Sequence, residues 1–209
     1  MVKRLLEYAE NHTTPESDVL QALTQATLDR CGEIRMIAGA YQGRLLSMIA
    51  HMIQPDRILE IGAFSGYSSI CFAEGLKPGA SLTAIDNDRG LEPLLTEYWR
   101  RAGVSDRCEI IWGNARDVIT TLEDIFDLVY IDADKVGYRR YYDLVFDKVR
   151  PGGFILFDNV FLRGHVFDAD PKRDVIADMQ QLNDFIQQDI RVENIMLPIR
   201  DGLMLVRKV

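Results

Sequence analysis

The spacing of hydrophobic residues changes near residue 55 of the chain. Before that point apolar residues recur every three or four positions, which predicts helices. One such run is Leu45, Leu46, Ile49 and Ile53. Pro15 stands where a second helix could begin, because proline suits the first turn of a helix, and Pro55 ends the region. We therefore expect a single domain, with a helical lead at residues 1–54 and an α/β core at residues 55–209.

After Pro55 the pattern becomes strand, glycine turn and helix, repeated along the chain. The candidate strands are Arg57–Ile61, Ser81–Asp86, Glu109–Trp112, Asp127–Asp132, Phe154–Asp158, Val192–Pro198 and Leu203–Val206. Leu128–Ile131 and Phe154–Phe157 are apolar on consecutive residues, as expected when helices cover both faces of a parallel sheet. Only residues 199–202 separate the last two strands, too few for a helical crossover, so these strands should form an antiparallel hairpin. The predicted fold class is α/β, a doubly wound and mostly parallel sheet of seven strands with N-terminal helices.

The composition is that of an ordinary globular protein. Of the 209 residues 47% are hydrophobic and 27% are charged, and no apolar run approaches the roughly 20 residues that cross a bilayer. Charged residues interrupt the first ten positions, which argues against a secretory signal, so we expect a cytoplasmic protein without membrane insertion. Cys31, Cys71 and Cys108 are widely separated, and we expect reduced core thiols rather than disulfides or a zinc site.

The net charge of −8 argues against a surface that attracts nucleic acid in general, because such affinity comes from lysine and arginine neutralising phosphates. Local basic patches stay open as an alternative. Their candidates are Arg139 with Arg140, and Lys172 with Arg173. Solvated helix charges are the simpler interpretation of these residues.

A glycine-containing turn, Glu-Ile-Gly-Ala-Phe-Ser-Gly-Tyr-Ser, occupies residues 60–68 after the first predicted strand. Ligands of open α/β sheets bind beyond the carboxyl ends of the strands, so this turn is a candidate binding site. Gly62 and Gly66 would let the backbone approach a ligand closely. Phe64 stands where the dinucleotide fingerprint needs a glycine beside the pyrophosphate, which disfavours a nicotinamide cofactor. A ligand with an ammonium, bound by Glu60, and a carboxylate, bound by backbone amides, suits the turn better.

The ends of the second and third predicted strands suggest a nucleoside. Asp86 ends the second strand, where a carboxylate can accept hydrogen bonds from two ribose hydroxyls. After the third strand the amide of Ala115 could bind an adenine edge, and Trp112 could lie against the ring or belong to the core. Together with the glycine turn, these residues predict a nucleoside-type cofactor.

Oxygen-bearing side chains follow the fourth and fifth predicted strands. Asp132 and Asp134 follow the fourth, and Asp158 and Asn159 follow the fifth. With no histidine or cysteine in either motif, such a set suits Mg²⁺, Ca²⁺ or Mn²⁺; the alternative is that Asp158 and Asn159 only cap a turn. A phenol has a pKa of about 10, and a coordinated dication would favour its ionised form. Lys135 is either the base that takes the acceptor's proton or a solvated lysine.

These motifs resemble those of class I S-adenosylmethionine-dependent methyltransferases, specifically the cation-dependent group that includes catechol and caffeoyl-coenzyme A O-methyltransferases. The resemblance covers nearly the whole chain and implies a Rossmann-like fold that uses S-adenosyl-L-methionine and a divalent cation, Mg²⁺ or else Ca²⁺ or Mn²⁺. The cofactor-binding residues that it implies are Met36, Glu60, Gly62, Ser68, Asp86, Ala115, Asp132 and Asp134. The metal ligands that it implies are Asp132, Asp158 and Asn159, and the catalytic residues are Lys135, as the base, and Asp132.

The acceptor is the part of the function that the resemblance leaves open. Tyr41-Gln42-Gly43 replaces the Asp-Glu-Gly of the plant enzymes in a stretch, 36–43, that closes over cofactor and acceptor. We expect the catechol-like or other acidic hydroxyl of a small molecule, with a 5-hydroxyuridine of transfer RNA as the alternative. A non-catalytic cofactor sensor and a nicotinamide-dependent oxidoreductase are further alternatives. The resemblance also implies a homodimer.

Two smaller sets of residues allow a structural or a functional interpretation. His165 could contact the acceptor, although a surface histidine is the simpler expectation. A packed helix face explains Tyr138, Tyr141 and Tyr142 at least as well as acceptor contacts do.

Overall fold

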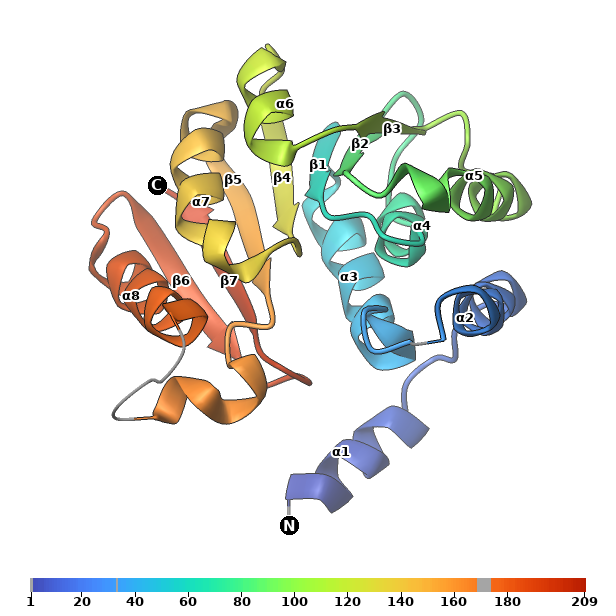
Figure 1. The fold of residues 1–209 in the computed structure, drawn as a ribbon, viewed down its shortest axis with the longest axis horizontal. Helices are drawn as coiled ribbons and strands as arrows, with labels where there is room; N and C mark the ends of the chain where they lie inside the picture. The colour runs from blue at the N-terminus through green and yellow to red at the C-terminus, as the bar shows by residue number, and fades with distance from the viewer. Residues whose placement is uncertain (1, 33, 169–173) are drawn as a thin grey trace.

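The computed structural model of the protein describes residues 2–32, 34–168 and 174–209. Its centre is a seven-stranded sheet with the order β3-β2-β1-β4-β5-β7-β6 (Figure 1). The strands are β1 (Arg57–Ile61), β2 (Ser81–Asp86), β3 (Cys108–Trp112), β4 (Phe126–Ile131), β5 (Val149–Asp158), β6 (Val192–Leu197) and β7 (Leu203–Lys208). Strands β1 to β5 pair in parallel, whereas β7 runs antiparallel to both β5 and β6. The predicted fold class is therefore confirmed.

Helices cover both faces of this sheet. They are α1 (Val2–Asn11), α2 (Asp18–Cys31), α3 (Gly39–Ile53), α4 (Tyr67–Ala73), α5 (Glu92–Arg101), α6 (Ala115–Thr121), α7 (Tyr138–Val145) and α8 (Asp174–Gln188). Short 3-10 turns are η1 (Arg89–Leu91), η2 (Lys135–Gly137), η3 (Phe146–Lys148) and η4 (Leu162–Phe167). Figure 1 shows α3, α4 and α5 on one side of the sheet, α7 and α8 on the other, and α1 away from it.

Two hydrophobic cores lie against the two faces, because side chains along a strand alternate in direction. In β4, Leu128 and Tyr130 pack with the helices of the α3 side. Val129 and Ile131 pack with α6, α7 and α8. The consecutive apolar residues of the central strands are thus explained by burial on both sides. Within the described ranges, no helix is long and apolar enough to cross a membrane.

Three local expectations differ from the structure. Helix α2 begins at Asp18, not near Pro15, because the Ser17 hydroxyl accepts a hydrogen bond from the amide of Leu20 at 3.4 Å and caps the helix there. Strand β5 begins at Val149, so the Pro-Gly-Gly sequence that follows lies inside the strand, beside an irregularity in its pairing with β4. Cys31 is exposed, so its expected core position is wrong, whereas Cys71 and Cys108 are buried as predicted.

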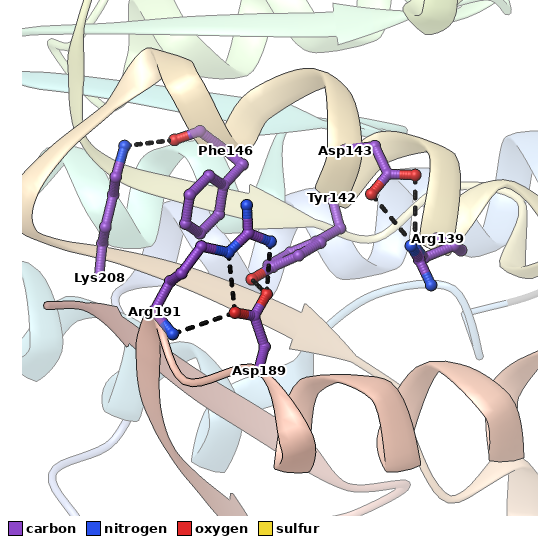
Figure 2. Close-up of polar contacts among 7 residues, drawn as sticks. All are labelled: Arg139, Tyr142, Asp143, Phe146, Asp189, Arg191 and Lys208. Carbon is purple, nitrogen blue, oxygen red and sulfur yellow. Dashed lines mark hydrogen bonds and ion pairs between the residues drawn. The ribbon is translucent and has the colours of Figure 1, made fainter.

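A cluster of polar contacts fastens the C-terminal hairpin to α7 (Figure 2). Asp189 accepts hydrogen bonds from the Arg191 guanidinium at 2.8 and 2.5 Å and from the Tyr142 hydroxyl at 2.8 Å. The same guanidinium lies over the Phe146 ring, 4.0 Å from its centre. Lys208 Nζ, at the end of β7, donates to the backbone oxygen of Phe146 at 2.8 Å. The Asp189 carboxylate thereby joins α7 to the segment before β6, and Lys208 separately joins β7 to Phe146.

The basic residues considered for a local patch are only partly described. Arg139 donates to Asp143 one helical turn away at 3.1 Å (Figure 2), and its guanidinium also lies over the Phe185 ring. The Arg139 guanidinium thus contacts side chains of α7 and α8, which favours the interpretation as a helix charge. Lys172 and Arg173 lie outside the described residues.

Substitution Asp189→Asn should lower the free energy of unfolding by about 1–3 kcal/mol, because it removes a charged hydrogen-bond acceptor. The Arg191 guanidinium holds the pKa of Asp189 below its ordinary value. The wild-type advantage is therefore present above pH ~4, where the unfolded carboxyl ionises, and is lost as the pH falls below it. Urea unfolding between pH 3 and 8 measures this.

The matched control is Glu97→Gln, which removes an exposed helical ion pair whose Arg101 nitrogen and Glu97 oxygen are 3.8 Å apart. It should cost less than about 0.5 kcal/mol. Equal costs for the two variants would contradict the stabilising role assigned to Asp189.

Candidate active site

The carboxyl ends of the parallel strands border a cleft of about 1340 Å³. Most of the residues predicted from the sequence for the site line this one cleft: Met36, Gly62, Ser68, Asp86, Ala115, Asp132, Asp134, Lys135, Asp158 and Asn159. Glu60 is the predicted residue that lies outside the lining. The structure thus brings the proposed cofactor and metal residues to a single place.

The turn after β1 depends on Gly62. Its φ is +95°, and a Cβ built there would lie 2.1 Å from the backbone oxygen of Asp132. The Asp132 amide in turn donates to the Ile61 oxygen at 2.8 Å. The backbones of the two turns touch here. Any side chain at residue 62 would therefore push the glycine turn of residues 60–68, called the cofactor turn below, away from the turn that follows β4.

The same turn orients Asp86 at the end of β2. The amide of Phe64 donates to Asp86 Oδ2 at 2.7 Å, and the amide of Asp88 donates to Oδ1 at 2.9 Å. Phe64 adopts a φ of 48°, in the left-handed region. Asp86 is therefore fixed at the cleft by backbone donors from two loops.

Glu60 lies beneath this turn and is fully buried. The hydroxyls of Ser68 and Ser69 donate to its two carboxylate oxygens. Burial raises the pKa of Glu60 to about 7, with the two serine hydrogen bonds opposing the shift. The role predicted for Glu60, binding an ammonium, stays a prediction, and Ser69 is a partner that the sequence pattern did not single out.

The rim of the cleft is built from β4 and β5. Ile131 and Phe157 are paired in the register of these parallel strands, so Asp132 and Asp158 follow at neighbouring positions. Burial and the charge of Asp132 raise the pKa of Asp158 to about 6. Asp132 Oδ1 accepts a hydrogen bond from Lys135 Nζ at 2.6 Å. The two carboxylates therefore interact, and one ammonium group compensates them.

Asn159 completes the set of oxygen atoms at the rim. Its φ is +58° and its backbone amide donates to Asp158 Oδ1 at 2.7 Å. Its side-chain amide lines the cleft and makes no hydrogen bond with any described residue. Across the described part of the chain, no three His, Cys, Asp or Glu side chains are grouped to hold a metal ion. A cation at this rim would therefore need the Asn159 amide oxygen, and oxygens from the acceptor or water, beside the two carboxylates.

Arg116, Tyr130 and Gln42 contact the carboxylates around the rim, and none of the three was predicted as a site residue. Asp134 is held by Arg116, at 2.8 Å, and by the hydroxyl of Tyr141. Asp158 Oδ2 accepts hydrogen bonds from the buried Tyr130 and Gln42. Tyr130 could not be predicted as a site residue because it lies in the apolar strand segment Leu128–Ile131. Gln42 belongs to Tyr41-Gln42-Gly43, which already differs from the Asp-Glu-Gly of the plant enzymes.

The remaining candidates divide between cleft and core. His165 is exposed, lines the cleft and lies 3.1 Å from Asp168 through its Nδ1. Tyr138 and Tyr142 lie on the buried face of α7, in the core, and Tyr141 of the same helix also reaches the cleft. Trp112 is partly buried and packs against the core of the α3 side.

The C-terminal hairpin also reaches the cleft, through its turn. Arg200 donates from Nη1 to the backbone oxygen of Ile37 at 2.8 Å. The guanidinium lies against Gly39, where an added Cβ would be 3.3 Å from Nη1. This contact fastens residues 35–38, which include Met36, beside the cofactor turn.

Two solved structures with the same fold are methyltransferases. One is the SAH-bound methyltransferase PaMTH1 from Podospora anserina, with a TM-score of 0.90, 28% sequence identity, and coverage of 100% of this chain and 95% of that one. Another is the O-methyltransferase TomG from Streptomyces achromogenes, in complex with SAM, with a TM-score of 0.88, 29% identity, and coverage of 97% and 94%. The likeness in fold and sequence over nearly the whole chain therefore places this protein among the methyltransferases.

Sequence comparison narrows this class. The profile of the O-methyltransferase family matches residues 10–209. A probable caffeoyl-CoA O-methyltransferase 1 from Dictyostelium discoideum is 32% identical, over 98% of this chain and 92% of its own length. The chain therefore belongs to the O-methyltransferase family, which confirms the resemblance of its motifs to S-adenosylmethionine-dependent O-methyltransferases.

Substitution Gly62→Ala should cost about 3–5 kcal/mol of stability and abolish binding of S-adenosylhomocysteine, because the new Cβ meets backbone atoms of the β4 turn. Gly79→Ala is the matched control, since Gly79 also has a positive φ but no atom within 4 Å of the added Cβ. The control should cost about 1–2 kcal/mol and leave binding intact. Urea unfolding and calorimetric titration measure both, and similar losses in the two variants would refute the contact.

Proposed function

We propose that this protein transfers the methyl group of S-adenosylmethionine to the hydroxyl of a small catechol-like acceptor, assisted by a divalent cation. The observation that carries the proposal is the rim of Asp132, Asp158 and Asn159, with Lys135 beside it, in the same cleft as the cofactor turn. In this reaction the bond between sulfur and the methyl carbon breaks and an oxygen–carbon bond forms. The products are S-adenosylhomocysteine, a methyl ether and a proton.

The donor set fits a hard divalent cation. Carboxylate and amide oxygens are the ligands that Mg²⁺, Ca²⁺ and Mn²⁺ prefer, and Asp132, Asp158 and Asn159 supply these atoms. The side-chain amide of Asn159 makes no hydrogen bond to a described residue, so its oxygen is available to a cation. A bound cation would neutralise the two interacting carboxylates and lower the pKa of a coordinated hydroxyl. A vicinal diol suits this rim because the protein offers a cation only three ligand side chains, and the two diol oxygens would add to the cation's coordination.

In this proposal Lys135 accepts the proton of the acceptor. Its Nζ lies 2.6 Å from Asp132 Oδ1 and 2.7 Å from the hydroxyl of Tyr138, so the amine is held at the rim. Tyr138 is buried and its hydroxyl donates to the backbone oxygen of Asp158 at 3.0 Å. The lysine is therefore anchored to both strands that carry the proposed metal ligands.

Several observations favour a small molecule over the alternatives. The net charge of −8 opposes general attraction of transfer RNA. Phe64 occupies the cofactor turn where a pyrophosphate needs glycine, which disfavours a nicotinamide cofactor. A cofactor sensor has no use for a lysine held beside two carboxylates, so a catalytic role accounts for more of the site.

Purified protein with labelled S-adenosylmethionine and Mg²⁺ should methylate caffeate-type catechols and leave matched monophenols unmodified. Chelation with excess EDTA should remove the activity, and added Mg²⁺ should restore it. Bulk transfer RNA from a strain lacking the gene serves as the competing acceptor in the same assay. Transfer to that RNA without transfer to any vicinal diol would overturn the proposed acceptor, and full activity in EDTA would overturn the metal.

Substitution Lys135→Met should lower kcat by about 10²–10⁴-fold, the usual effect of removing a general base, with little change in affinity for S-adenosylhomocysteine. The residual rate should rise with pH as the acceptor ionises without the base. Lys77→Met is the control, because Lys77 pairs with Asp56 at 2.6 Å away from the cleft. Steady-state kinetics from pH 6 to 10 measure the effect, and an unchanged kcat would exclude Lys135 as the base.

A further inference from the structure

Two buried side chains that do not line the cleft donate hydrogen bonds to the Asp158 carboxylate. Gln42 Nε2 donates to Asp158 Oδ2 at 2.6 Å, and the hydroxyl of Tyr130 donates to the same oxygen at 2.6 Å. Gln42 is 1% exposed and Tyr130 is fully buried. The two donors are themselves 3.5 Å apart, so they form one closed group around a single carboxylate oxygen.

Gln42 reaches this position because α3 packs closely on α4. The next residue, Gly43, has no room for a side chain, since a Cβ there would lie 2.9 Å from both Cys71 Sγ and Tyr67 Cε1. The close approach carries the amide of Gln42 to the end of β5, 116 residues later in the sequence. A residue of the N-terminal helices thus belongs to the environment of the rim.

The hydrogen bonds distinguish the two oxygens of Asp158. A carboxylate oxygen has two lone pairs to share. Oδ2 already accepts two hydrogen bonds, from Gln42 and Tyr130, whereas Oδ1 accepts one, from the amide of Asn159. Oδ1 is therefore the oxygen left to bind a cation. Gln42 also adds no charge, whereas a glutamate in its place would put another carboxylate beside Asp132 and Asp158.

We propose that Gln42 is a positioning residue for the metal site: with Tyr130 it occupies Asp158 Oδ2 and fixes the carboxylate so that Oδ1 binds the cation. The inference rests on the proposed function, since it assumes a cation at Asp132, Asp158 and Asn159. Partners behind a metal ligand fix its orientation, and their loss costs affinity for the metal although they never touch it.

The test uses Mn²⁺ binding by the full-length protein, followed by electron paramagnetic resonance titration without acceptor. The substitution Gln42→Met keeps the length of the side chain and removes the hydrogen-bond donor. The Kd of this variant for Mn²⁺ should rise about 10- to 100-fold. The Kd for S-adenosylhomocysteine, measured by calorimetry, should stay within twofold of wild type, which separates positioning from a general loss of structure.

Tyr130→Phe removes the other donor to the same oxygen. It should also weaken Mn²⁺ binding, and the double variant with Gln42→Met should lose less than the product of the two single effects, because both act on one carboxylate. Gln25→Met is the matched control. Gln25 also donates to a carboxylate, that of Asp29 at 2.8 Å, but on the exposed face of α2, and this variant should bind Mn²⁺ as the wild type does.

The outcomes separate this inference from the proposed function. Wild type that binds Mn²⁺ while Gln42→Met binds it equally well would overturn the positioning role and leave the proposed function standing. Wild type that fails to bind Mn²⁺ would overturn the proposed metal site and the inference with it. If Gln42→Met does not fold, Gln42→Asn replaces it, since it retains an amide but withdraws the donor by one carbon–carbon bond. Unchanged Mn²⁺ affinity in Gln42→Asn would likewise overturn the inference.

Discussion

The rest of the site depends on holding two carboxylates, Asp132 and Asp158, side by side at the ends of adjacent parallel strands. Their mutual repulsion and the burial of Asp158 are unfavourable. The protein offsets this cost with donors on every side: Lys135 on Asp132, and Tyr130, Gln42 and the Asn159 amide on Asp158. Two like charges held together despite repulsion and burial are typical of a functional site rather than of a structural one.

The donors come from different layers of the fold, which ties the site to the whole domain. Gln42 belongs to α3 on one face of the sheet, Tyr130 to β4 within it, and Lys135 to the turn before α7 on the other face. The helices ahead of the first strand therefore do more than cover the sheet. Gly62 lets the backbones of two turns touch, and Gly43 lets α3 pack against side chains of α4, so both glycines bring these donors together.

Much of this architecture could be predicted from the sequence because it follows from strong local patterns. Apolar runs such as Leu128–Ile131 identify strands buried on both faces, and the rule that ligands bind at strand ends then locates Asp86, Asp132 and Asp158. The short connection before Leu203 predicts the hairpin, although not that β7 would lie between β5 and β6.

What could not be predicted depends on contacts between distant segments. The residues around Tyr130 do not indicate that it donates to Asp158, because every residue of β4 is buried and the strand has the pattern of ordinary core. Gln42 could be noticed only as a departure from a motif, and its partner lies in another strand. The exposure of Cys31 follows from the place where α2 ends, and helix ends are weakly encoded by sequence.

The bond between Arg200 and the Ile37 carbonyl has a consequence for the order of assembly during synthesis. A ribosome releases the chain from its N-terminus, and domains fold as their parts become available. Residues 35–38 are translated early, but the arginine that holds them lies between β6 and β7. Residues 35–38 therefore lack this contact until Arg200 has been translated, and a chain that stops before Arg200 would leave that side of the cleft without it.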